Sequence, residues 1–89
     1  MGWIVRIESS SFPGKCCYLY RDSRGNIKRH LNIAHLFETR AAAIMEIELL
    51  RREIKLKIVE NTDNLDTRLR YAEVVQHDQV DSGSMVFFN

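Results

Sequence analysis

The sequence predicts an α+β domain in which a small antiparallel sheet packs on one long central helix. Residues 39–61, which contain no glycine or proline, repeat apolar residues with helical spacing. Shorter segments on both sides alternate apolar and polar residues between turn signals, which is typical of strands. With 89 residues, 45% of them hydrophobic, the chain has the size and composition of a single globular domain spanning residues 1–89.

The first part of the chain predicts a hairpin or a three-stranded meander, with strands at residues 3–8, 15–21 and 27–31. In the first strand Trp3, Val5 and Ile7 share one face, because side chains alternate along a strand. Pro13-Gly14 predicts the first turn, and residues 22–26 are expected to form the hairpin loop. The third strand is the more polar one, so we place it at an edge of the sheet.

A helical turn is expected next, over residues 32–37. Asn32 can cap this turn, and helical spacing then directs Ile33, Leu36 and Phe37 inward. Thr39 is the expected N-cap of the central helix, since a threonine side chain can accept a hydrogen bond from the first helical turn.

The central helix has an inner apolar stripe that faces the sheet. Its members recur at spacings of three and four residues: Ala43, Ile47, Leu50, Ile54 and Ile58. The stripe continues without a breaker, which favours a helix that runs to about residue 60. The alternative is a break near residue 54, because residues 54–58 also alternate with the period of a strand.

The C-terminal part is expected to return to the sheet. Residues 61–66 predict a polar loop, residues 67–76 a strand and residues 81–84 a turn. The short apolar segment 85–88 either pairs with the preceding strand as a hairpin or docks on the helix.

A second apolar stripe lies on the opposite side of the central helix and consists of Met45, Leu49 and Leu56. A helix that merely rests on a sheet has one apolar face, so a second face indicates that something covers it. Leaving each of these side chains exposed would forgo roughly 1.5–3 kcal/mol. The candidates are the C-terminal segment, a second copy of the chain in a homodimer, and a partner protein, and we predict an assembly interface here.

Basic residues gather around the second hairpin. The set predicted to steer a partner electrostatically is Arg21, Arg24, Lys28 and Arg29. Residues 1–40 carry seven basic and three acidic residues, whereas residues 41–89 carry six basic and nine acidic ones, so the excess positive charge is local. An acidic protein surface fits this hairpin. The alternative is a small nucleic-acid-binding regulator in which the hairpin follows a phosphate backbone and Tyr18 and Tyr20 stack on bases. The simplest reading is a charged strand edge that prevents aggregation.

The remaining reactive residues do not form a recognised catalytic or metal-binding pattern. Cys16 and Cys17 are adjacent, so on a strand they point to opposite faces, and the spacing of His30 and His35 is a weak match to a zinc site. We therefore expect no enzymatic activity, no cofactor and no metal. The first apolar run is too short for a signal-peptide core or a membrane span, so we expect no membrane contact. The two adjacent cysteines are not placed to form a disulfide, which favours a reducing, cytoplasmic setting.

The first half of the chain resembles small accessory proteins encoded by phages and prophages. The segments that carry the resemblance are WIVRIE, CCYLY and AHLFETRAAAI, and the last contains an A-x-x-F-x-T/S-x-x-x-A pattern. In this sequence the pattern falls on Ala34, Phe37, Thr39 and Ala43. The resemblance implies a stoichiometric modulator that binds a host or defence-system protein, such as an anti-CRISPR-like inhibitor in the host cytoplasm.

Overall fold

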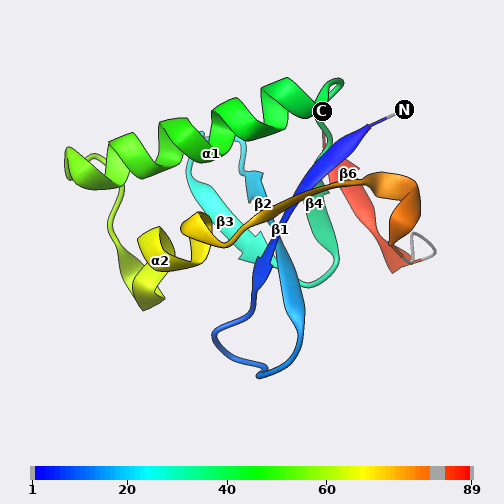
Figure 1. The fold of residues 1–89 in the computed structure, drawn as a ribbon, viewed down its shortest axis with the longest axis horizontal. Coiled ribbons are helices and arrows are strands. Elements are labelled where there is room, and N and C mark those ends of the chain that lie inside the picture. The colour runs from blue at the N-terminus through cyan, green and yellow to red at the C-terminus, as the bar shows by residue number, and fades with distance from the viewer. Residues whose placement is uncertain (1, 81–83, 89) are drawn as a thin grey trace.

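The computed structural model describes residues 2–80 and 84–88 and confirms a mixed α+β fold (Figure 1). Its elements follow one another along the chain as β1 (Trp3–Glu8), β2 (Cys16–Arg21), β3 (Ile27–His30), β4 (Ile33–His35), α1 (Arg40–Lys55), the 3₁₀ turn η1 (Thr62–Asn64), α2 (Leu65–Arg70), β5 (Glu73–Gln76), the 3₁₀ turn η2 (His77–Gln79) and β6 (Val86–Phe88). The long central helix is α1, and the short α2 lies near its C-terminal end (Figure 1).

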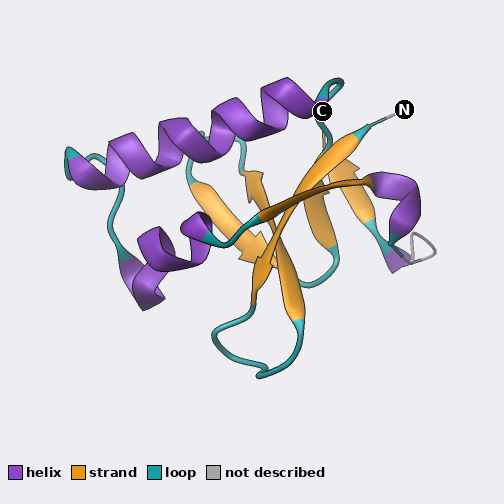
Figure 2. Cartoon of the chain, in the orientation of Figure 1, coloured by secondary structure: helices purple, strands orange, loops and turns teal. Residues whose placement is uncertain are grey.

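The main sheet has four antiparallel strands in the order β3-β2-β1-β5, and β4 and β6 form a separate parallel pair (Figure 2). The predicted strands β1, β2 and β3 are confirmed, and β3 lies at an edge as expected. Gly14 has a φ of +79° in the turn between β1 and β2, where a residue with a side chain would be strained.

The core between the sheet and α1 contains the side chains that the alternation predicts. Val5, Ile7 and Leu19 from the sheet pack with Ala43 and Leu50 of α1, and all five are buried. The helix therefore covers the face of the sheet that carries the odd-numbered residues of β1 and β2.

The opposite face of the sheet is also covered. Ile4 and Tyr18 point to this side and are buried against Ala34 of β4, with Phe87 of β6 packed on the same cluster. The C-terminal segment thus covers the back of the sheet. Our two expectations for residues 85–88, a hairpin with the preceding strand and docking on the helix, were both wrong, because β6 pairs in parallel with β4.

The helical turn expected at residues 32–37 is instead strand β4. Ala34 is the buried member, and Ile33 and His35 on either side of it point away from the core, as strand alternation requires. Phe37 exchanges two backbone hydrogen bonds of 2.8 Å with Trp3. Extended backbone at residues 33–37 is therefore stabilised by pairing with β6 and β1, which a local helical pattern does not reveal.

Helix α1 begins as predicted and ends earlier than predicted. The hydroxyl of Thr39 accepts a hydrogen bond from the N–H of Ala42 at 3.1 Å, which confirms it as the N-cap. At the other end Lys57 has a φ of +62°, and the N–H groups of Lys57 and Ile58 bond the carbonyls of Ile54 and Glu53. This is a Schellman motif, so the helix stops at Lys55 rather than near residue 60, and Ile58 is exposed rather than part of the inner stripe.

The loop and strand expected between residues 61 and 76 are only partly correct. Residues 62–70 form η1 and α2, and only Glu73–Gln76 is a strand, paired with β1. Leu65 and Leu69 lie one helical turn apart and are both buried, which explains why this segment is helical. The turn expected at residues 81–84 lies, apart from Ser84, outside the described residues.

Candidate functional site

The outer side of α1 carries exposed apolar side chains in a line. Met45, Leu49 and Leu56 are 66%, 48% and 62% exposed, and no described residue covers them. Leu56 is the C-cap residue, but its N–H still bonds the carbonyl of Arg52 at 2.9 Å, so it remains in register with the helix. We call the line formed by Ala42, Met45, Leu49, Arg52 and Leu56 the helix seam.

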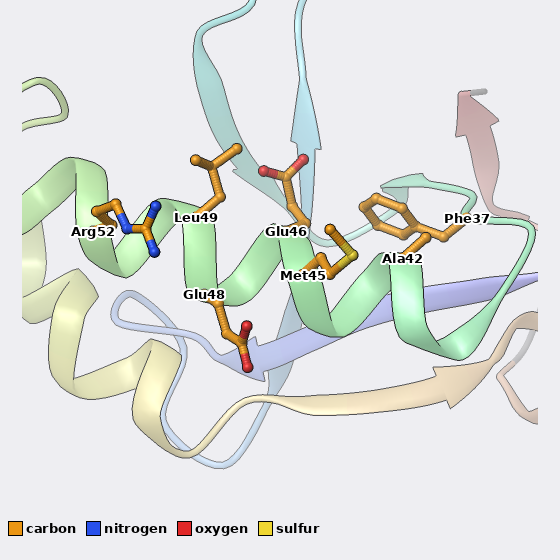
Figure 3. Close-up of a pocket in the computed structure, with 7 residues that line it drawn as sticks. All are labelled: Phe37, Ala42, Met45, Glu46, Glu48, Leu49 and Arg52. Carbon is orange, nitrogen blue, oxygen red and sulfur yellow. The ribbon is translucent and has the colours of Figure 1, made fainter.

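A shallow groove runs along the helix seam from Ala42 to Arg52. Its volume is about 450 Å³, and it is lined by Phe37, Ala42, Met45, Glu46, Glu48, Leu49 and Arg52. Figure 3 shows Phe37, from the segment before α1, beside Ala42 and Met45, while the charged side chains leave the helix around them. The groove thus has an apolar floor at Phe37 and Met45 and a polar rim, as binding surfaces for apolar side chains do.

A second apolar surface lies on the outer side of the β4–β6 pair. We call the aromatic face the set formed by Ile33, His35, Val86 and Phe88 of this pair together with Tyr20 of β2, whose ring lies next to that of Phe88. The parallel register places Ile33 beside Val86 and His35 beside Phe88. Val86 and Phe88 are 50% and 44% exposed, and the rings of Tyr20 and Phe88 are 5.7 Å apart. The sheet therefore presents two large apolar side chains of β6 to solvent.

Phe37 connects the aromatic face to the helix seam. Its ring centroid lies 4.3 Å from that of His35, and the same ring lines the groove on α1. The two surfaces are therefore neighbours that meet at one aromatic side chain.

Two of the four predicted basic residues are held by ion pairs within the chain. The Arg21 guanidinium donates to Glu46 at 2.8 Å and to Glu53 at 3.1 Å, and its hydrogen bond to Glu46 is the main reason that the pKa of Arg21 is raised. Arg29 pairs with Asp63 at 3.2 Å. These two side chains fasten the hairpin to α1 and to η1.

Arg24 and Lys28 are the two exposed members of the set. Lys28 lies opposite Tyr20 in the β2–β3 ladder, so both side chains are on the same face of the sheet. The basic hairpin therefore borders the aromatic face. Tyr18, in contrast, is buried, which raises the pKa of its hydroxyl and removes its ring from contact with any ligand.

The structure separates the cysteines as expected, with Cys16 exposed and Cys17 buried. Burial raises the pKa of the Cys17 thiol. Within the described residues, no three His, Cys, Asp or Glu side chains are close enough to hold a metal ion. None of the described helices has the length and apolar character of a membrane span.

The sequence predicted the outer stripe of Met45, Leu49 and Leu56, which is exposed, and it did not predict the aromatic face. A signal for it was present in the alternation of Val86, Phe87 and Phe88, which predicts that a strand buries Phe87 and exposes its neighbours. Comparisons of the chain with models of protein families, with curated proteins and with solved structures gave no match. The helix seam and the aromatic face are therefore the candidate functional surfaces of the chain.

Proposed function

We propose that this chain is a non-enzymatic protein-binding module that docks its aromatic face on an acidic, partly apolar surface of another protein. The observation that carries the proposal is the exposure of Val86 and Phe88, with the ring of Phe88 5.7 Å from that of Tyr20 and Lys28 across the ladder from that tyrosine. Exposed aromatic side chains with a charged rim are the usual composition of a protein interface.

The contribution of each part follows from its exposure and charge. Burying the exposed part of Phe88 and Val86 would stabilise a complex through the hydrophobic effect, which acts in proportion to the apolar area removed from water. Arg24 and Lys28 would raise the rate of association with an acidic partner and make it dependent on salt. Arg21 and Arg29 would act indirectly, by holding the hairpin in place.

In biological terms we propose a stoichiometric modulator, of the kind that phages use to inhibit a host or defence-system protein. The resemblance to phage accessory proteins supports this role, and the residues of the shared pattern have clear structural tasks here. Ala34 and Ala43 are buried where β4 and α1 meet the sheet, Thr39 caps α1, and Phe37 packs on the core. Binding alone is sufficient for such a role, and the proposal includes no catalytic step or cofactor.

Nucleic-acid binding through the hairpin is less well supported. Two of the four basic side chains are engaged by carboxylates, and Tyr18 is buried and so cannot stack on a base. Titration with labelled oligonucleotides at two salt concentrations tests this alternative, since phosphate contacts predict weaker binding as salt rises.

The proposal is tested by affinity capture from host extract with three variants. Phe88→Asp places a charge in the aromatic face and Lys28→Glu reverses its rim, whereas Tyr71→Asp makes the same aromatic-to-acid change at an exposed tyrosine of α2's C-cap, away from both surfaces. We expect one protein to be retained by the wild type and by Tyr71→Asp. Its affinity should fall at least about tenfold for Phe88→Asp, as for a central interface aromatic. Equal retention by Phe88→Asp and the wild type would refute the proposed surface.

A further inference from the structure

We infer that the helix seam is a self-complementary interface through which two copies of the chain associate with their α1 helices antiparallel. This inference concerns a different surface from the proposed docking site, because Val86 and Phe88 lie on β6 and outside the seam. The proposed docking site and the proposed dimer interface can therefore be refuted independently of each other.

The spacing along the helix seam is that of a coiled coil. Positions 42, 45, 49, 52 and 56 are separated by three, four, three and four residues, which is the a/d repeat of a heptad. The inner stripe of α1 is already buried against the sheet, so this outer repeat is available to a second helix.

The two ends of the helix seam have complementary shapes. The groove runs from Phe37 to Arg52, with Phe37 and Met45 at its N-terminal end. The exposed Leu56 does not line it and projects beyond its C-terminal end. A two-fold axis near the middle of the seam, between residues 50 and 51, places Leu56 of each copy against Met45 and the groove of the other. The same contact then forms twice, as symmetric dimers require.

Charge selects the antiparallel orientation. A parallel pair would place Arg52 against Arg52 of the second copy and Glu48 near Glu53 of the second copy, and both contacts repel. An antiparallel pair places Arg52 against Leu49 and brings Glu48 near Lys55 of the second copy. Glu48, Arg52 and Lys55 make no ion pair with any other described residue, so they are free to do this.

The other flank of the helix seam would carry Glu46 and Glu53 from both copies. These carboxylates would repel one another across an antiparallel interface if they were unpaired. Arg21 donates to both of them in each copy, which neutralises much of this charge. Arg21 therefore lowers the repulsion between the carboxylates of the two copies when their helix seams meet.

The extent of the contact sets the strength of the dimer. A helix of 16 residues is about 24 Å long, so one pair of helices buries less than the roughly 1,200–2,000 Å² of a standard interface. We therefore expect a reversible dimer with a dissociation constant on the order of micromolar.

Sedimentation equilibrium over a concentration series tests the association. We expect the wild type and Tyr71→Glu to form dimers with similar dissociation constants, and Leu49→Glu to raise the constant at least about tenfold. Leu49 is half exposed, and circular dichroism melting will show that the variant remains folded. A wild type that stays monomeric at millimolar concentration, or a dimer that Leu49→Glu leaves unchanged, would overturn the inference.

Charge exchange tests the orientation. Glu48→Lys and Lys55→Glu should each weaken the dimer, and the double variant should restore it, because the antiparallel arrangement pairs these two positions across the interface. A second measurement uses Met45→Cys and Leu56→Cys chains, both with Cys16→Ser. Mixing them under oxidising conditions should give the heterodimer disulfide in preference to either homodimer. Preferential homodimer disulfides, or a double charge variant weaker than both single variants, would exclude the antiparallel arrangement.

Discussion

Replacing Arg21 by methionine should destabilise the fold by about 2 kcal/mol, although Arg21 is one of the basic residues expected to steer a partner. The guanidinium donates to Glu46 and Glu53 at 2.8 and 3.1 Å and also to the carbonyl of Gly25 at 2.9 Å. A further hydrogen bond joins Arg21 Nε to Glu46 at 3.3 Å. Methionine keeps most of the apolar stem and removes all four hydrogen bonds. Two neighbouring carboxylates on α1 are then left without a counter-ion.

The magnitude follows from the burial of the cluster. The side chains of Arg21, Glu46 and Glu53 are 25%, 14% and 20% exposed, so the cluster lies between a surface and a buried ion pair. Exposed pairs contribute about 0–1 kcal/mol, and breaking a buried pair costs about 3–5 kcal/mol. A loss of about 2 kcal/mol corresponds to a fall in melting temperature of roughly 8–16 °C for a domain of this size.

Urea and thermal unfolding followed by circular dichroism measure this loss. Arg24→Met is the matched control, because Arg24 is exposed and its side chain makes no hydrogen bond or ion pair among the described residues. A triple variant with Arg21→Met, Glu46→Gln and Glu53→Gln should recover much of the stability, since it removes the uncompensated charges.

The reasoning is refuted if Arg21→Met and Arg24→Met change the free energy of unfolding by the same small amount. It is also refuted if the triple variant is less stable than Arg21→Met, because the carboxylates would then stabilise the fold without their arginine.

Three further predictions concern the core, the thiols and the hairpin loop. Leu50→Ala should lower the free energy of unfolding, measured in urea, by about 3 kcal/mol because it leaves a cavity at a fully buried site. Leu49→Ala should lower it by less than about 1 kcal/mol. Equal losses would mean that the two faces of α1 are misassigned. Iodoacetamide should alkylate Cys16 rapidly and Cys17 only on unfolding, since burial of Cys17 raises the pKa of its thiol. Mass spectrometry of native and urea-treated protein measures the labelling. Rapid labelling of both cysteines in the native protein would contradict this prediction. Hydrogen bonds from the N–H groups of residues 26 and 24 hold the pKa of Asp22 below its usual range, so the stability that this carboxylate contributes is present above its unfolded pKa of about 4 and is lost as pH falls through the lower folded pKa. Asp22→Asn should therefore destabilise most at neutral pH, and a stability difference that is independent of pH between 2 and 7 would count against this reasoning.

The sequence predicted those parts of the fold that depend on local alternation and capping. The faces of β1 and β2 follow from side chains that alternate, and Thr39 has the residue type of an N-cap directly before a helical repeat. The inner stripe at Ala43 and Leu50 has a helical period that a strand cannot produce.

The sequence left the end of α1 open between about residue 60 and a break near residue 54, and the structure supports the second. The sequence favoured the longer helix because a lysine occupies the position where glycine usually ends a helix. Lys57 adopts a positive φ, and the Schellman hydrogen bonds compensate for the strain. In α2, two leucines four residues apart are too few to distinguish a short helix from a strand. Both errors arise where a local pattern fits two structures and tertiary packing decides between them.

The two candidate surfaces also differ in how far a local sequence pattern predicts them. The helix seam depends on the period of one helix, so Met45, Leu49 and Leu56 were found from the sequence. The aromatic face depends on the parallel pairing of β6 with β4, whose partners are 53 residues apart in the chain, as for Ile33 and Val86. The alternation of residues 86–88 predicts which of them face outward, but no local signal specifies β4 as the partner strand, and so the face was missed.

The exposure of both surfaces has a common physical cause. The sheet and α1 together present four apolar sides, and α1 covers one side of the sheet with its own inner stripe. The back of the sheet and the outer stripe of α1 remain. The short strand β6 covers the back of the sheet, where Phe87 packs beside Ile4 and Tyr18. Strand alternation then forces Val86 and Phe88 outward, while the outer stripe of α1 receives no described segment. One apolar side of α1 therefore stays exposed, and β6 adds a second exposed apolar side. These are the two surfaces for which we propose partners.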